Sequence, residues 1–192
     1  MEDLATGQDY EVLSKLIRGK RTAFEFGSFR GGSALAVLPE LQKNGGRLYC
    51  IDHFRGNNDD PYTNIPRREM VDSFLARTEP YWDSLTVIIG STKEALLFPQ
   101  SYADMVFIDA GHSYKEVLHD IQCAIHLVRR GGIICGHDYV RHYKDCDPEA
   151  MALYSETPDG GHDGVGYGVI RAVHESFGQP NHEAAVWWVE VV

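Results

Sequence analysis

TAFEFGSFRGGSALAVL, residues 22–38, joins a mostly apolar segment, a glycine-rich loop and the start of an alanine- and leucine-rich segment. The continuous apolar character of 22–28 is typical of a strand whose two faces are both buried. Glycine is costly in regular structure and is kept where the backbone turns tightly or lets a ligand approach. The stretch therefore predicts a strand, a ligand-binding turn and a helix in direct succession.

The same alternation continues along the chain. Further buried strands are predicted at 47–54, 85–91, 104–110 and 131–139. The clearest helix between them is 114–129, where apolar residues recur on one face. Strands that alternate with helices predict a parallel sheet with right-handed crossovers. We expect one domain over 1–192, a doubly wound, mostly parallel α/β fold preceded by a helical segment at 1–20.

Local signals refine the helix boundaries. Ser113 and Glu116 have the spacing of a capping box at the start of the long helix. Arg129, Arg130 and Gly131 are expected to close its end. The helix of the glycine-rich stretch is expected to kink or end at Pro39.

Two polar segments, 55–66 and 140–164, do not fit the alternation. Loops of this length in a compact domain are usually functional or disordered. Both follow strand ends, at the edge where open α/β sheets bind ligands, so we interpret them as lids over an acceptor site. Plain surface loops are the alternative interpretation.

Composition and charge limit the partners and the compartment. The chain has 18 Lys and Arg against 28 Asp and Glu, a formal net charge of −10. Nucleic acids and anionic membranes bind proteins through a positive field, so neither is an expected partner. Residues 1–20 lack the apolar run of a signal peptide, and no stretch approaches the ~20 apolar residues that cross a bilayer. Four cysteines without metal-like spacing are expected to be reduced, as in a cytoplasmic protein.

The glycine loop differs from that of dinucleotide-binding proteins. Their G-x-G-x-x-G pattern has a glycine where the pyrophosphate approaches, and Phe29 takes that position here. The loop instead suits a ligand with a positive group beside Glu25 and a carboxylate at the amides of the helix N-terminus. S-adenosylmethionine carries both groups. Asp52 ends the second strand and is placed to accept hydrogen bonds from ribose hydroxyls, with His53 beside the adenine.

Two further acids end neighbouring strands. Asp109 lies at the end of the fourth predicted strand and Asp138 at the end of the fifth. Adjacent parallel strands lie ~4.8 Å apart, so both carboxylates point toward one place. Two acids this close repel each other unless a proton or a metal ion lies between them. Hard divalent ions such as Mg²⁺ take oxygen ligands of this sort.

From about residue 20 onward, the chain resembles class I S-adenosylmethionine-dependent methyltransferases. More narrowly, it is similar to small-molecule O-methyltransferases related to the macrocin and mycinamicin sugar enzymes and to the cephalosporin-hydroxylase-like group. The matching stretches are FEFGSFRGGSA, LYCIDHFRG, VIIGS, VFIDAGHSYKEVLHDI and GGIICGHDY. The resemblance implies a Rossmann-like fold in which the first stretch, with Gly27, Ser28, Gly31 and Ser33, holds the methionine moiety. It further implies that the second stretch holds the ribose and that Ser91 lies near the adenine.

The resemblance also implies a metal ion that binds a substrate hydroxyl and lowers its pKa. His112 matches the position of the general base, so Asp109 and His112 are the predicted catalytic residues. His137 takes a position where the sugar enzymes often have a second acid. The predicted metal ligands Asp109, His137 and Asp138 could therefore suit Mn²⁺, Fe²⁺ or Zn²⁺ better than Mg²⁺.

The sequence thus predicts methyl transfer from S-adenosylmethionine to a hydroxyl of a small molecule, such as a sugar or natural product, with or without Mg²⁺ or Mn²⁺. A Rossmann-type NAD-dependent oxidoreductase is one alternative, which Phe29 opposes. A non-catalytic nucleotide-binding module is another, which the set Asp109, His112 and Asp138 opposes. The identity of the acceptor and the formation of a homo-oligomer are left open.

Overall fold

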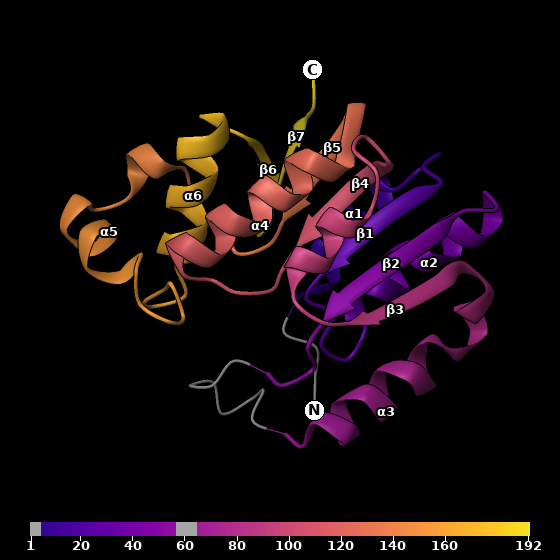
Figure 1. The fold of residues 1–192 in the computed structure, drawn as a ribbon. Helices are drawn as coiled ribbons and strands as arrows, with labels where there is room; N and C mark the ends of the chain where they lie inside the picture. Colours follow the sequence, from indigo (N-terminus) through magenta and orange to yellow (C-terminus); the bar gives the residue numbers. More distant parts are fainter. Residues whose placement is uncertain (1–4, 57–64) are drawn as a thin grey trace.

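The structure is a computed structural model that describes residues 5–56 and 65–192. Its centre is a seven-stranded sheet with the order β3-β2-β1-β4-β5-β7-β6 (Figure 1). The parallel strands are β1 (Thr22–Phe26), β2 (Arg47–Asp52), β3 (Leu85–Ile89), β4 (Ala103–Ile108) and β5 (Val128–Gly136). The antiparallel strands are β7 (Val186–Glu190), which pairs with β5, and β6 (Asn181–Glu183), which pairs with β7. The predicted doubly wound, mostly parallel α/β fold is confirmed.

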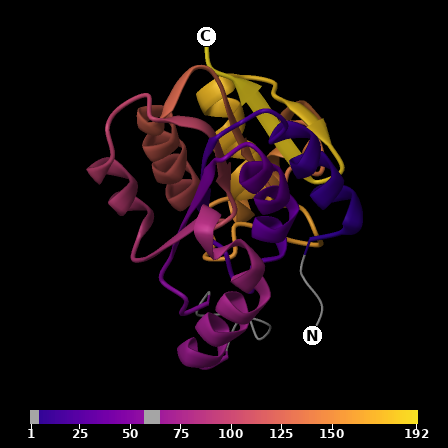
Figure 2. The same ribbon diagram turned by 90° about the vertical axis from the view of Figure 1, so that its right-hand side faces the viewer.

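Helices cover both faces of this sheet. The α-helices are α1 (Gly7–Leu16), α2 (Gly32–Lys43), α3 (Arg67–Thr78), α4 (Tyr114–Leu127), α5 (Pro148–Tyr154) and α6 (Tyr167–Phe177). Short 3₁₀ helices are η1 (Glu79–Ser84), η2 (Thr92–Leu97) and η3 (Tyr143–Asp145). Figure 2 shows α4 on one side of the sheet and α1 and α2 on the other.

The strand residues alternate between two cores. Phe24 and Phe26 of β1 pack in the core that includes the buried residues of α4 and α6. Ala23, the residue before Phe24 in β1, packs in the other core, which includes the buried residues of α1, α2 and α3. Successive side chains of a strand point to opposite faces, and here both faces are covered. This explains why the strands are continuous apolar runs in the sequence.

The strand register aligns the carboxyl ends of the central strands. Phe26 pairs with Ile51 on one side and with Ile108 on the other, and Ile108 pairs with Gly136. The loops that follow these strands therefore leave the sheet at one edge, where open α/β sheets bind ligands.

The predicted start of α4 is correct but its predicted end is wrong. The Ser113 hydroxyl and the Glu116 carboxylate form the capping box. Helix α4 ends at Leu127. The next residue, Val128, is the first of β5 and pairs with Ala103 of β4. Arg129, which was expected to close the helix, lies in β5 and donates a hydrogen bond of 2.6 Å to Asp104. Pairing with a neighbouring strand overrides the local signal for the end of a helix.

Pro39 does not end α2, which continues to Lys43. Leu38 and Leu41, on either side of the proline, are fully buried in the core beneath the helix. Packing of this apolar face outweighs the backbone hydrogen bond that a proline cannot make.

The two segments predicted to be lids have different outcomes. Most of 55–66 lies outside the described residues. The segment 140–164 contains η3 and α5, so it is not a plain loop. Its role as a lid stays a prediction. In the described part of the chain, no helix has the length and apolar character needed to cross a bilayer.

Candidate active site

A cavity of about 510 Å³ lies at the carboxyl edge of the sheet, within the size range of small-molecule sites. Loops that follow each of the five parallel strands contribute to its lining. The predicted catalytic and metal residues that line it are Asp109, His112, His137 and Asp138. The predicted cofactor residues that line it are Gly27, Ser28, Ser33, Asp52, His53 and Ser91, whereas Glu25 and Gly31 do not.

Gly27 brings the glycine loop against the end of β4. Its φ is +81°, a left-handed conformation that side chains disfavour. A Cβ atom on Gly27 would lie 2.1 Å from the carbonyl oxygen of Asp109. The loop therefore reaches the fourth strand only because this residue has no side chain.

Glu25 organises the same loop from below. It is 2% exposed, and it accepts hydrogen bonds from the hydroxyls of Ser28 and Ser33 at 2.5 and 2.6 Å and from the thiol of Cys50 at 3.1 Å. Burial raises the pKa of Glu25 to about 6, although these hydrogen bonds favour the ionised form. Glu25 thus fixes two serines on the cavity wall. Its contact with a positive ligand group stays a prediction.

Asp52 ties the glycine loop to the loop after β2. One carboxylate oxygen accepts hydrogen bonds from the amides of Ser28 and Phe29 at 2.7 and 2.9 Å. The other accepts from the amide of Phe54 at 2.6 Å. Phe29 and Phe54 have φ values of 45° and 51°, and Asp138 has 61°. Non-glycine residues in this region are strained, and such residues cluster at functional sites.

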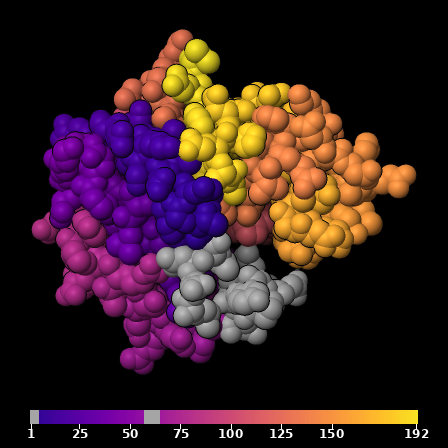
Figure 3. Space-filling view, turned by 180° about the vertical axis from the view of Figure 1, so that it is seen from behind, coloured from indigo at the N-terminus to yellow at the C-terminus, as the bar shows by residue number. Residues whose placement is uncertain are grey.

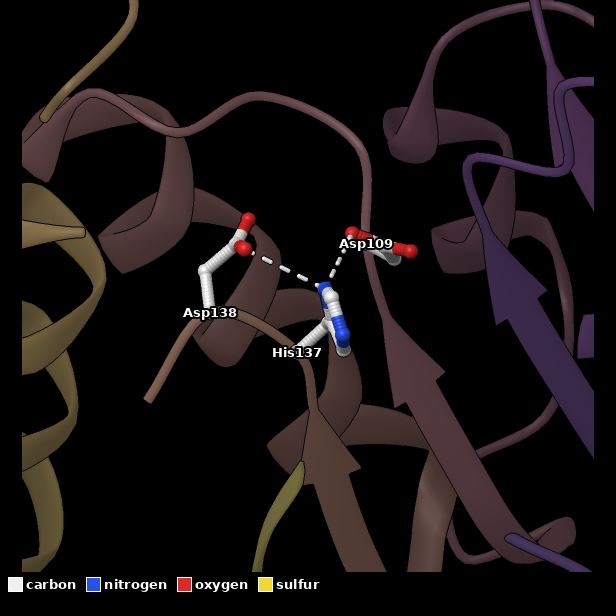
Figure 4. Close-up of side chains that lie close together, drawn as sticks. All are labelled: Asp109, His137 and Asp138. Carbon is white, nitrogen blue, oxygen red and sulfur yellow. Dashed lines mark ion pairs between the residues drawn. The ribbon is translucent and has the colours of Figure 1, made fainter. Parts of the chain in front are cut away.

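A cluster of two histidines and two acids forms one end of the cavity. The Nδ1 atom of His137 lies 3.2 Å from Asp138 Oδ1 and 3.9 Å from Asp109 Oδ1 (Figure 4). The Nε2 atom of His112 lies 3.2 Å from Asp138 Oδ2 and 3.7 Å from Asp109 Oδ1. The predicted convergence of Asp109 and Asp138 is therefore present. Each of the two imidazoles, of His112 and of His137, lies near both carboxylates.

The acids of this cluster hold both imidazoles in the charged form. Burial favours the neutral form of His112, yet Asp109 and Asp138 raise its pKa to about 9. Burial likewise opposes the charged form of His137, whose pKa is raised to about 10 by Asp138, Asp109 and Asp9. The pKa values of both imidazoles therefore lie above neutral pH.

Asp9 of α1 belongs to this site and was not anticipated from the sequence. It is 2% exposed, and its Oδ2 atom lies 3.5 Å from Nε2 of His137. The same carboxylate accepts hydrogen bonds from Thr6 at 2.7 Å and from the amide of Ala185 at 3.0 Å. Figure 3 shows the N-terminal and C-terminal surfaces side by side. The capping-box pattern of Thr6 and Asp9 predicts a helix start, but nothing local predicts the contact with His137.

The donor set fits a divalent cation. Asp109, His137 and Asp138 each offer one ligand atom, and these atoms lie within 4.8 Å of one another. The Nε2 atom of His137 is buried without a hydrogen-bond partner, and Asp9 is the acid next to it. A carboxylate beside the outer nitrogen of a histidine is the usual support of a metal ligand. Two carboxylates and an imidazole suit Mn²⁺, Fe²⁺ or Zn²⁺.

The loop that carries His112 packs against Gly160, in the segment before α6, and against Gly168, in the first turn of α6. A Cβ atom on Gly160 or Gly168 would lie 1.8 or 2.2 Å from the carbonyl oxygen of His112. None of the described residues of 140–164 lines the cavity. In this structure the segment therefore supports the backbone beneath His112.

Solved structures share this fold. The O-methyltransferase TomG from Streptomyces achromogenes, in complex with S-adenosylmethionine, has a TM-score of 0.68 at 19% identity over 100% of this chain and 84% of that chain. The O-methyltransferase from Bacillus cereus, in complex with S-adenosylhomocysteine, has a TM-score of 0.64 at 18% identity over 97% and 82%. The cofactor-bound protein Rv0187 from MTB has a TM-score of 0.69 at 17% identity over 100% and 83%. At these identities the likeness establishes the fold.

The sequence comparison adds the family. No curated protein matches this sequence. A family described as a methyltransferase domain matches residues 24–139, which is more than half of the chain. The matched region includes the glycine loop, Asp52, Asp109, His112 and Asp138. The chain therefore belongs to the methyltransferase-domain family.

Proposed function

We propose that this protein transfers a methyl group from S-adenosylmethionine to a hydroxyl oxygen of a small molecule. The observation that carries the proposal is the meeting, in one cavity, of the glycine loop, Asp52 and the His–Asp cluster. Two O-methyltransferases of the same fold hold S-adenosylmethionine or its product, which supports the choice of donor. A net charge of −10 supports a small acceptor rather than a nucleic acid.

The donor would lie along the edge of the sheet. The loop before α2 offers backbone amides at a helix N-terminus, which suit the carboxylate of the methionine part. Asp52 lies next, and a carboxylate has about four lone-pair sites, so it can accept from ribose hydroxyls while it holds backbone amides. Ser91 and Thr92, after β3, line the end that remains for the adenine.

The reaction is a displacement at the sulfonium methyl group. The acceptor oxygen bonds to the methyl carbon while the carbon–sulfur bond breaks, and the electron pair stays on sulfur to give S-adenosylhomocysteine. The hydroxyl proton passes to His112, which lines the cavity beside Asp109 and Asp138. Because Asp109 and Asp138 raise the pKa of His112, it must release its own proton before it can act as a base. Much of the rate would come from the alignment of the reacting atoms.

Asp109, His137 and Asp138 are the residues that would hold a divalent cation such as Mn²⁺ or Mg²⁺. When bound, a cation supplies positive charge that lowers the pKa of an acceptor hydroxyl. These three residues would hold the cation at the end of the cavity that His112 also lines. Activity that survives exhaustive chelation would contradict this part of the proposal.

Titration calorimetry of the purified protein with S-adenosylmethionine, and with NAD in parallel, tests the function. We expect binding of S-adenosylmethionine alone, because Phe29 occupies the place that a diphosphate needs. Asp52→Ala is expected to weaken this binding by about 10- to 100-fold, the usual effect of losing hydrogen bonds to a charged group. Binding of NAD alone would overturn the proposal in favour of an oxidoreductase.

A further inference from the structure

Asp120 is a buried acid that the mechanism above does not use. It lies on α4, is 3% exposed and lines the cavity. One of its carboxyl oxygens accepts a hydrogen bond of 2.5 Å from the hydroxyl of Thr92. Burial raises the pKa of Asp120 to about 7, and Glu116, one turn earlier, acts in the same direction.

Asp120 has a neutral hydroxyl, that of Thr92, as its hydrogen-bond partner. In the described ranges 5–56 and 65–192, no lysine, arginine or histidine forms an ion pair with Asp120, and the hydroxyl of Thr92 is the hydrogen-bond donor that reaches its side chain. Burial of an acid with so little compensation costs stability. A strongly shifted acid inside a cavity is a candidate for ligand binding. A hydrogen-bond donor on a ligand would compensate this acid.

The position of Asp120 selects which part of the ligand this is. The sheet order runs from β3 through β2, β1 and β4 to β5. Along this edge the cavity passes from Thr92 after β3, to Asp52 after β2, to Gly27 after β1, and then to Asp109 and Asp138. Strands ~4.8 Å apart place Thr92 and the His–Asp cluster at opposite ends. The donor molecule has a matching order, with adenine, ribose and sulfonium in sequence.

Resting on the proposed function, we propose that Asp120 recognises the 6-amino group of the adenine and so determines the specificity for an adenosyl cofactor. Thr92 donates to one carboxyl oxygen and leaves the other to accept from the amino group. When Asp120 is ionised, as it is above pH 7, a base with an oxygen at the same place, as in hypoxanthine, presents an acceptor to an acceptor. Sites built around such hydrogen bonds discriminate strongly, because a mismatch leaves buried polar groups unpaired.

A purely structural role makes a different prediction. The bond between Thr92 and Asp120 also joins η2 to α4. If this tie were the whole role of Asp120, its loss would weaken the binding of adenosyl and inosyl ligands alike. The ratio of the two affinities separates the two roles.

The experiment measures this ratio by titration calorimetry with S-adenosylhomocysteine and S-inosylhomocysteine. For the wild-type chain we expect the adenosyl ligand to bind at least about 100-fold more tightly. Asp120→Asn keeps the shape of the side chain, and its amide can donate to the 6-oxo group. We expect it to lower the ratio by about 10- to 100-fold. Thr92→Val, which frees the carboxyl from its tether, should lower the ratio less.

Glu149→Gln is the control, because Glu149 is exposed on α5 and does not line the cavity. Its ratio should stay within about twofold of wild type. If the wild-type chain binds the adenosyl ligand but Asp120→Asn keeps the wild-type ratio, the inference is overturned and the proposed function stands. If the wild-type chain binds neither ligand, the proposed function itself fails, and this inference with it.

Discussion

The two ends of the cavity shift the pKa of an acid in opposite directions. At one end, burial alone would raise the pKa of Asp138, but His137 and His112 hold it below its usual value. At the other end, burial raises the pKa of Asp120 to about 7, because its partner is a neutral hydroxyl. Glu25, beneath the glycine loop, is also bonded to neutral groups, and burial raises its pKa to about 6. Charged partners and a side chain that is 34% exposed favour the ionised form of Asp138, whereas neutral partners and deep burial favour the neutral forms of Asp120 and Glu25.

The largest expected effect on activity comes from a substitution in the His–Asp cluster. His112→Ala removes the proposed base and one of the two cations beside Asp109 and Asp138. We expect turnover to fall by about 100- to 10,000-fold. The affinity for S-adenosylhomocysteine should change little. The measurement is the rate of S-adenosylhomocysteine formation with an acceptor found by screening hydroxylated small molecules.

His174→Ala is the control for this variant, because His174 stacks on Tyr143 and does not line the cavity. It should retain turnover. Full turnover by His112→Ala would remove His112 from the role of base and would leave Asp109 as the remaining predicted catalytic residue.

Asp120, at the end of the cavity where the acid has a neutral partner, predicts that the free energy of unfolding depends on pH. The pKa of Asp120 is 3.8 in the unfolded chain and about 7 in the folded chain. Between these two pH values the folded chain keeps the proton of Asp120 and the unfolded chain loses it. A rise in pH through this window therefore destabilises the wild type, by up to about 4 kcal/mol. Asp120→Asn lacks this loss, so its stability relative to wild type should increase from pH 4 to pH 8. Urea unfolding across this range measures the difference, and a difference that is independent of pH would contradict the shifted pKa.

Glu25→Gln is expected to change the pH dependence of stability in the same direction as Asp120→Asn, but by a smaller amount. The pKa of Glu25 rises from 4.5 to about 6 on folding, so the pH-dependent loss in the wild type is up to about 2 kcal/mol. Relative to wild type, the variant should gain stability between pH 4.5 and 6 and show no further gain above that window. A gain that continues to pH 8 would assign the effect to another group. The same unfolding series serves for both variants.

Features with local causes could be predicted from the sequence. The buried strands were visible because both faces of the sheet are covered, and the capping box of Ser113 and Glu116 lies within one turn. The ends of α2 and α4 could not be predicted, because they depend on distant partners. Helix α2 continues past Pro39 because its apolar face packs on the core. Helix α4 ends before Val128 because Val128 pairs with Ala103 of β4.

The candidate site divides in the same way. Asp109 and Asp138 were predictable because parallel strands end at one edge. The sequence does carry a signal for Asp120, which is an acid within the apolar stripe of Val117, Ile121 and Ala124 on α4. Asp9 had none, because its partners His137 and Ala185 are remote in the chain. An acid whose role depends on residues brought together only by the fold has no pattern to reveal it.

The contact of Asp9 with Ala185 has a consequence for the order in which the protein matures during synthesis. This hydrogen bond joins residues separated by 176 positions. A nascent chain therefore carries the glycine loop and the His–Asp cluster on the ribosome well before Ala185 emerges. Until then, the carboxylate beside His137 lacks one of the donors that fix it. The candidate site is therefore complete only after translation of the β6–β7 hairpin, even if the parallel strands pair earlier.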